Sequence, residues 1–416
     1  MTDARQTPAD QPARDRALKI DQSFIVQAPA GSGKTSLLVE RYLRLLTQVA
    51  QPEEILAITF TRAAAAEMKQ RVLEELRKPT PLTEIIRDRD KAQNWRLNQN
   101  PQRMKIQTID SFATELATQI PGSQSAEGMR IEEQPAPLYT QAAQNVLGRL
   151  FSDDPGRLFV GEFLSALDNN AATAERVLSS MLAKRDQWLD VTGLITSMAL
   201  NDGAAIQQTL ERAITELRQE IMSTVTVALS PHDSEMIHTL ASKTDRQANL
   251  EALLPLILTQ GGTIRKTIDR RQGEVFGDKA FKSQVVEWFD ELRERELEGL
   301  LQTCAMLPDL GEDSTTIVAT GVTLALAAAE LETLLQRRQT IDFTGMLMRA
   351  SQGLRDDEGP TDLALYWDYK IKHLLVDEFQ DTSRSQYKFF CLLTEGWSVE
   401  EGHTFFAVGD PMQSIY

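Results

Sequence analysis

The sequence predicts an α/β fold in which a parallel β-sheet carries helices on both faces and a large all-helical insertion interrupts it. Short apolar runs lie near both ends of the chain, and each is followed by a helical pattern or by a loop leading to one. Between about residues 122 and 339 this pattern gives way to long helical segments. Near-continuous apolar runs that alternate with helices are typical of parallel strands buried on both faces. The predicted strands are residues 24–27, 55–60, 104–108, 372–376 and 405–408.

The same change of pattern predicts the domain organisation. Residues 1–121 and 340–416 are expected to form the two parts of one α/β domain, and residues 122–339 the helical insertion. A chain of 416 residues exceeds the size at which one hydrophobic core usually suffices, so two domains are expected.

A phosphate-binding loop is predicted after the first run, which reads as a short buried strand. Gly31 and Gly33 lie between this strand and an amphipathic helical stretch. Glycine adopts backbone angles closed to other residues, so successive N–H groups can converge on phosphate oxygens beside the N-terminus of a helix. Lys34 is expected to reach the β- and γ-phosphates, and the Thr35 hydroxyl to ligate Mg²⁺. The predicted nucleotide-binding residues are Ala28, Pro29, Ala30, Gly31, Ser32, Gly33, Lys34, Thr35 and Ser36.

A pair of carboxylates follows the run 372–376. Asp377 and Glu378 come directly after it. Open parallel sheets bind ligands beyond the carboxyl ends of their strands, so both carboxylates should lie beside the phosphate loop if the two strands share a sheet. Asp377 would then hold the Mg²⁺ shell, and Glu378 would orient and deprotonate the attacking water. The alternatives are an ordinary Gly-Ser turn for the loop and a solvated acidic loop for the carboxylates.

Five segments, in order along the chain, resemble the motifs of one family. They read APAGSGKTS, AITFTRAAAAEM, QTIDSF, VDEFQDT and VGDPMQSIY and begin at residues 28, 57, 107, 376 and 408. Together they resemble the superfamily 1 DNA helicases of the UvrD/Rep type, and within them the AddA- and RecB-like helicase subunits of recombination nucleases. The resemblance implies a RecA-like P-loop NTPase domain that uses ATP and Mg²⁺, with subdomain 1B as the helical insertion.

The resemblance also implies a function. The chain is expected to be the ATP-binding N-terminal motor half of an ATP-dependent 3′–5′ DNA helicase in double-strand-break repair or recombination. Single-stranded DNA and single-strand/duplex junctions are the implied partners, together with an AddB-like subunit. Relatives continue into a second RecA-like domain that supplies arginines, whereas this sequence stops at Tyr416, so weak or absent hydrolysis is expected of it alone. A non-catalytic DNA- or partner-binding remnant is one alternative, and a P-loop ATPase unrelated to DNA is another.

Further site residues are implied by the resemblance. Gln413 joins Lys34 and Glu378 as a catalytic residue that projects toward the γ-phosphate while Tyr416 faces DNA, so one short loop would couple the nucleotide state to the DNA. Gln380 assists this coupling; alternatively, both glutamines are ordinary exposed loop amides. Phe60 and Tyr416 would stack on DNA bases. Alternatively, Phe60 only packs, and a serine or threonine in such a turn is only a helix cap, as Ser111 could be before the helical stretch 112–116. The remaining predicted DNA contacts are Thr61, Arg62, Thr108 and Ser111.

The sequence departs from the family in places. Most relatives read adenine with a glutamine shortly before the first strand, where Arg14, Asp15 and Arg16 stand here, so base recognition is expected to differ. Arg62 and Ala63 stand where Asn-Lys is common, which removes one lysine from a DNA-facing turn.

Composition indicates a cytoplasmic protein. Two cysteines cannot form a disulfide framework, the N-terminus does not read as a signal peptide, and no apolar run is expected to span a membrane. The net charge of −16 argues against a protein whose whole surface is positively charged. It does not exclude DNA, because affinity depends on the field along the binding groove and on base stacking.

Overall fold

The protein is described by a computed structural model that forms two compact units. The first unit comprises Met1–Ala143, Leu178–Asp190 and Ala328–Tyr416, and the second comprises Gln144–Val177 and Val191–Ala327. The predicted boundaries after residues 121 and 339 remain proposals. The structure describes residues 10–29, 31–121, 126, 128–189, 215–216, 218–227, 229–244, 246–248, 250–259, 261–268, 279–295, 297–306, 310–356, 359–398, 400–410 and 412.

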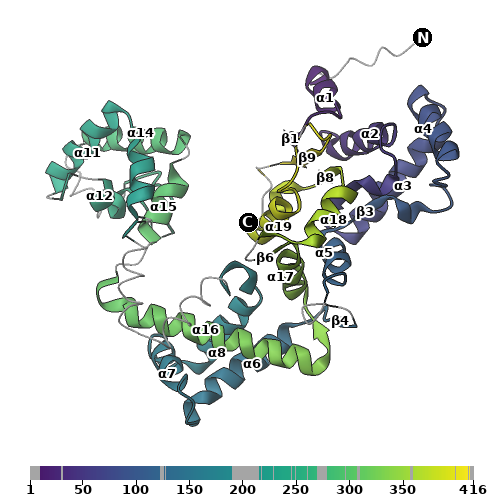
Figure 1. Cartoon of the computed structure of the whole chain (residues 1–416). Helices are drawn as coiled ribbons and strands as arrows, with labels where there is room; N and C mark the ends of the chain where they lie inside the picture. Colours follow the sequence, from purple (N-terminus) through teal and green to yellow (C-terminus); the bar gives the residue numbers. More distant parts are fainter. Residues whose placement is uncertain are drawn as a thin grey trace. The chain divides into compact units, whose positions relative to one another are not determined.

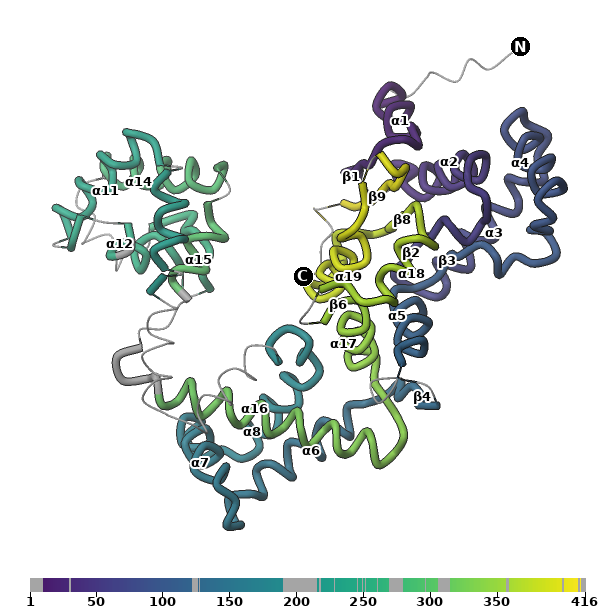
Figure 2. The backbone as a smooth tube through the Cα atoms, viewed as in Figure 1, coloured from purple at the N-terminus to yellow at the C-terminus, as the bar shows by residue number. Residues whose placement is uncertain are grey.

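The first unit is built on a five-stranded parallel sheet of order β1-β9-β8-β2-β3, which confirms the predicted α/β class. The two strands from the end of the chain lie between the first two, as Figures 1 and 2 show. Loops that are far apart in the sequence therefore follow the carboxyl ends of neighbouring strands. The strands are β1 (Phe24–Gln27), β2 (Ile55–Thr59), β3 (Lys105–Thr108), β8 (His373–Val376) and β9 (Thr404–Gly409).

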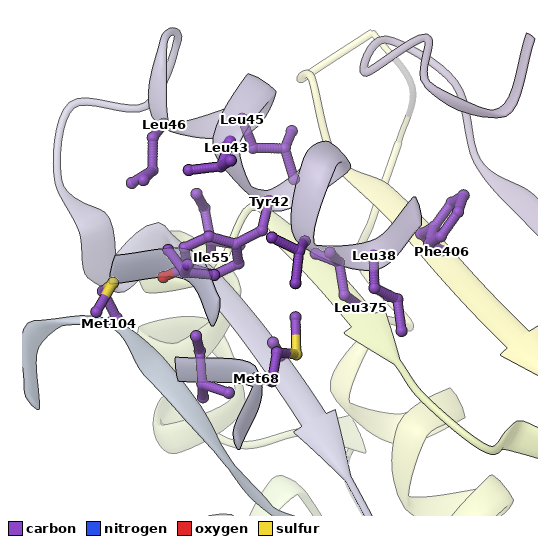
Figure 3. Packing of buried hydrophobic residues seen from close by; sticks show 14 of the residues in the cluster. Leu38, Tyr42, Leu43, Leu45, Leu46, Ile55, Met68, Met104, Leu375 and Phe406 are labelled. Atoms are coloured by element: carbon purple, nitrogen blue, oxygen red, sulfur yellow. The ribbon is translucent and has the colours of Figure 1, made fainter. Parts of the chain in front are cut away.

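Helices cover both faces of this sheet, because successive strand side chains point to opposite sides. In β2, Ile55 and Ala57 join one core with α2, α3 and α4, whereas Leu56 and Ile58 join another with α5, α17, α18 and α19. Figure 3 shows Tyr42 of α2 in the first core. The helices are α1 (Gln11–Ala17), α2 (Lys34–Leu46), α3 (Arg62–Arg77), α4 (Pro81–Ala92), α5 (Ile109–Ala117), α17 (Phe343–Leu354), α18 (Asp362–Lys370) and α19 (Arg384–Leu393).

The prediction that the first strand is buried is wrong for one of its faces. β1 is the edge of the sheet and pairs with β9. Phe24 and Val26 pack against the core that contains α2, but Ile25 keeps 66% of its surface exposed. A short apolar sequence is compatible with an edge strand and with a central one, because the strands that pair with it and the helices that cover it come from distant segments.

The segment that precedes β1 is attached to α2 by a buried arginine. Arg41 of α2 is fully buried and donates hydrogen bonds to the carbonyl oxygens of Ala17 (2.5 Å), Lys19 (2.8 Å) and Gln22 (2.6 Å). Its guanidinium also lies over the Phe406 ring, 4.4 Å from the centroid. Burial lowers the Arg41 pKa to about 10, which leaves it charged at neutral pH. These contacts position α1, the short helix before the phosphate loop.

The chain returns to the sheet through a buried ion pair in the first unit. Asp342 caps α17 by accepting from Gly345 N, and its carboxylate binds the guanidinium of Arg185 and the Tyr139 hydroxyl. Next to it, two short strands form a parallel pair, and a small antiparallel pair follows α17. These strands are β4 (Arg130–Ile131), β5 (Thr340–Ile341), β6 (Arg355–Asp356) and β7 (Gly359–Pro360).

The second unit is helical in the part of it that the structure describes, apart from one isolated bridge between Leu258 and Ile264. Its core gathers Trp288, Phe289 and Leu253. Buried Asp233 is bonded by Trp288 and Arg295, which satisfies its charge. The helices that lie in or run into this unit are α6 (Ala136–Gly148), α7 (Arg157–Ser165), α8 (Ala171–Leu182), α11 (Pro231–Thr244), α12 (Leu250–Ile257), α14 (Lys279–Glu294), α15 (Glu298–Met306) and α16 (Leu310–Arg338).

The expectation that no apolar run could span a membrane needs correction at α16. Thr315–Arg338 is long and apolar enough by length and composition, and the mean hydropathy of an 18-residue window within it is 1.5. Its alanines, leucines and valines account for that value. In that 18-residue window, 44% is buried inside the protein. Core helices of soluble proteins reach the same length and hydropathy, so this helix is weak evidence for a membrane span.

Candidate functional site

The predicted phosphate loop joins β1 to α2. Gly31 and Gly33 have φ angles of +73° and +84°, in the left-handed region that side chains disfavour. Gly33 is the N-cap of α2 and has no side chain with which to cap the first N–H groups of the helix, so these groups can bind a ligand. Ala30 lies outside the described residues.

The hydrogen-bond donors of the loop are suited to binding a phosphate group. The Ser32 hydroxyl is buried and has no hydrogen-bond partner among the described residues. The Lys34 side chain is 8% exposed, so its charge is held at the loop. Thr35 is half-buried and Ser36 is exposed, both in the first turn of α2. A helix N-terminus with free donors and a fixed cation is suited to a polyanion.

The carboxylate pair meets this loop, as the shared sheet requires. Lys34 Nζ lies 3.6 Å from Glu378 Oε2. Asp377 N donates to the Ile58 carbonyl at 2.9 Å, which extends the β8–β2 pairing by one residue. The alternative of a solvated acidic loop does not account for the contact between Glu378 and a cation from the opposite end of the chain.

The Asp377 carboxyl has a pKa raised to about 6, first by burial and then by the charge of Glu378. Lys34 and Arg71 act in the other direction and favour the ionised form. Arg71 is not predicted as a site residue. Its place on α3, the helix that follows the second of the five motifs, is the only feature of the sequence that points to it. The ionised form that these two cations favour is the one that supplies carboxylate oxygens to a hard divalent ion.

Gln380 connects the carboxylate pair to the end of β9. Its side-chain amide donates to Glu378 Oε2 at 2.8 Å, and its carbonyl oxygen accepts from Asp410 N at 2.9 Å. A Cβ on Gly409 would lie 2.7 Å from that oxygen, so only glycine fits there without displacing the bridge. Gln413 and Tyr416, on the chain beyond β9, lie outside the described residues.

The predicted DNA contacts follow the ends of β2 and β3. Phe60 is 46% exposed, so it does not serve as a fully buried core residue. Arg62 is exposed and pairs with Glu133 at 3.4 Å. Thr61 caps α3, and buried Thr108 caps α5 by accepting from Ser111 N. The helix-cap alternative therefore applies to Thr61 and Thr108, although the hydroxyl of a cap can still meet a ligand. It is wrong for Ser111, which lies inside α5 because the helix begins two residues earlier.

Glu378 has an unusual backbone conformation, with φ 49° and ψ 46°. A side chain in this left-handed region costs roughly 1–2 kcal/mol. We expect Glu378→Gly to be more stable than Glu378→Ala by about 1 kcal/mol, the reverse of the usual order, because both lose the carboxylate but only glycine relieves the backbone. Urea unfolding of the two variants measures the difference. A more stable alanine variant would contradict this account of the backbone.

The raised Asp377 pKa makes stability depend on pH. Its folded value of about 6 lies above the ordinary 3.8, so the stabilisation is fully present below pH 3.8 and is lost as the pH rises through 6. Asparagine cannot ionise. We therefore expect the unfolding free energy of Asp377→Asn minus that of the wild type to grow by about 1 kcal/mol between pH 5 and pH 8. Urea unfolding at both pH values tests this, and a constant difference would show that Asp377 titrates normally.

Comparison with known proteins gives a family match over almost the whole chain. The family model described as the UvrD/REP helicase N-terminal domain matches residues 10–416. The match includes the phosphate loop, the carboxylate pair and the sheet that joins them.

Named relatives are similar along the chain. A protein of Bacillus pumilus, named as one subunit of an ATP-dependent helicase/nuclease, is 26% identical over 95% of this chain. Proteins of the same name from Lactobacillus helveticus and Staphylococcus saprophyticus are each 25% identical, over 94% and 95% of it. The chain covers 34%, 35% and 34% of these three relatives, about a third of their length.

Proposed function

Since the chain belongs to the UvrD/REP helicase family, we propose that it is the ATP-binding first half of the motor of an ATP-dependent DNA helicase. The observation that carries this proposal is the 3.6 Å approach of Lys34 Nζ to Glu378 Oε2, because it joins a phosphate loop to a carboxylate pair. A motor that hydrolyses a nucleoside triphosphate needs both at one place.

The proposed cofactors are ATP and Mg²⁺. Loop N–H groups and Lys34 bind and orient the phosphates, and the Thr35 hydroxyl and Asp377 would hold the ion. When bound, Mg²⁺ supplies charge neutralisation at the phosphate oxygens. Glu378 orients the attacking water and accepts its proton at a carboxylate oxygen. The bond between Gln380 and Glu378 fixes that carboxylate and links it to the end of β9.

For the whole protein of which these residues form part, we propose a more specific function. It would translocate 3′–5′ on single-stranded DNA and act at single-strand/duplex junctions. Its role would be in double-strand-break repair or recombination in the cytoplasm. The relatives are named as one subunit of a helicase/nuclease, which supports a partner in the form of a second, AddB-like subunit. A non-catalytic remnant is less favoured, because Lys34, Asp377 and Glu378 are all present.

DNA binding separates a helicase from other P-loop ATPases. We expect Phe60→Ala to weaken binding of a fluorescent oligothymidine about tenfold, because stacking contributes about 1–3 kcal/mol per base. Fluorescence anisotropy at low salt measures it. Ile85→Ala, an exposed apolar residue of α4, is the matched control and should leave affinity unchanged. Equal affinities of Phe60→Ala and wild type would remove the stacking role.

A further inference from the structure

Arg14 of α1 lies on the phosphate loop. Its Nη2 donates to the Ser32 carbonyl, and its Nη1 is 3.5 Å from the position that a Cβ would take on Gly33. The side chain is 25% exposed. A second cation from outside the loop thus stands at the N-terminus of α2, in addition to Lys34.

The position of Arg14 is determined by its neighbours. Arg41 attaches the segment after α1 to α2 by three hydrogen bonds to carbonyl oxygens. Asp10, the N-cap of α1, accepts a hydrogen bond from Arg14 Nε at 2.8 Å. The guanidinium is therefore presented to the loop in one orientation, with little side-chain entropy left to lose when a ligand binds.

The charges at this place favour an anion. Arg14 and Lys34 bring two cations to the N-terminus of α2, where the helix dipole is also positive, and each has one carboxylate partner, Asp10 or Glu378. A polyanion bound here would be attracted by both cations and by the dipole. A guanidinium offers donors in a planar fork that matches phosphate oxygens. It has no acceptor, so it cannot accept a hydrogen bond from the exocyclic amino group that distinguishes adenine.

We propose that Arg14 is a nucleotide-binding residue that contacts the phosphates of the bound triphosphate, so that this site binds nucleoside triphosphates with little regard to their base. The inference rests on the proposed function, because it takes the phosphate loop as the nucleotide site. It assigns the segment before β1 to phosphate binding instead of base reading.

The test compares Arg14→Ala, Arg14→Lys and Arg14→Gln by titration calorimetry with MgATP, MgGTP, MgUTP and inorganic tripolyphosphate. We expect the wild type to bind the three nucleotides within about threefold of one another. Arg14→Ala should weaken all four ligands about tenfold or more, the range for a charge-assisted hydrogen bond. Lysine keeps the charge and should restore most of the affinity, whereas glutamine should behave like alanine. Arg16→Ala, an exposed arginine of the same helix, is the matched control and should bind as the wild type does.

Two results would overturn the proposal. Wild-type affinity of Arg14→Gln would show that a neutral donor to the Ser32 carbonyl is sufficient for nucleotide binding. Arg14 would then stabilise the loop without contacting the phosphates. A loss confined to MgATP, with tripolyphosphate unaffected, would show base recognition. Lys34→Ala separates this inference from the proposed function: if Lys34 is required and Arg14 is not, only the inference fails, and if neither is required, the nucleotide site itself is wrong.

Discussion

Replacing Lys34 by alanine is expected to raise the dissociation constant for MgATP roughly 10²- to 10³-fold, since the ammonium makes charge-assisted hydrogen bonds and its loss leaves buried charge uncompensated. The Lys34 side chain is 8% exposed and stands 3.6 Å from Glu378. Without it, the γ-phosphate would meet the carboxylates of Glu378 and Asp377 with one fewer cation between them. Repulsion then adds to the lost hydrogen bonds.

Titration calorimetry measures this effect, and the thermal shift on adding MgATP provides a second reading. Lys91→Ala, an exposed lysine at the end of α4, controls for the change of net charge. Wild-type affinity in Lys34→Ala would contradict the assignment of the loop as the phosphate site.

Glu378→Gln is expected to slow hydrolysis roughly 10²- to 10⁴-fold, the usual contribution of a general base. Glutamine keeps the size of the side chain and a hydrogen-bonding partner for Gln380, but it cannot accept the proton of the attacking water. Nucleotide affinity should stay equal or rise, because one negative charge near the γ-phosphate is removed. The variant therefore separates chemistry from binding.

Single-turnover hydrolysis with excess protein is the appropriate measurement, because it reads the chemical step directly. Glu395→Gln, whose carboxylate pairs with Arg355 on the surface, is the matched control and should hydrolyse ATP at the wild-type rate. Hydrolysis by Glu378→Gln at the wild-type rate would assign the base to another group.

Much of the fold could be predicted from local patterns. The apolar runs at 24–27, 55–60 and 372–376 became strands within one residue at each end, because buried parallel strands need continuous apolar side chains. The order of strands could not be predicted, since it depends on pairing between distant segments. For the same reason the exposure of Ile25 was missed: only the sheet order places β1 at an edge.

The candidate site was predictable in its residue types but not in its geometry. Gly31, Lys34 and Glu378 could be singled out, because phosphate binding and water activation need those groups. The left-handed backbone of Glu378, the Gln380 bridge and the position of Arg14 depend on tertiary contacts that no local pattern encodes. Thr108 shows why the role of a residue cannot be predicted from its type alone. Its hydroxyl suits a phosphate contact and a helix cap equally well, and here it caps α5.

The central claim is that Thr35 and Asp377 share one nucleotide-bound metal ion. A crystal structure of the chain with Mn²⁺ and a non-hydrolysable ATP analogue tests it most directly, because anomalous scattering locates the ion. The account predicts one ion about 2.1 Å from the Thr35 hydroxyl oxygen, with the Asp377 carboxylate bound to it directly or through one water. An ion on the nucleotide that Asp377 does not reach, even through a water, would contradict it.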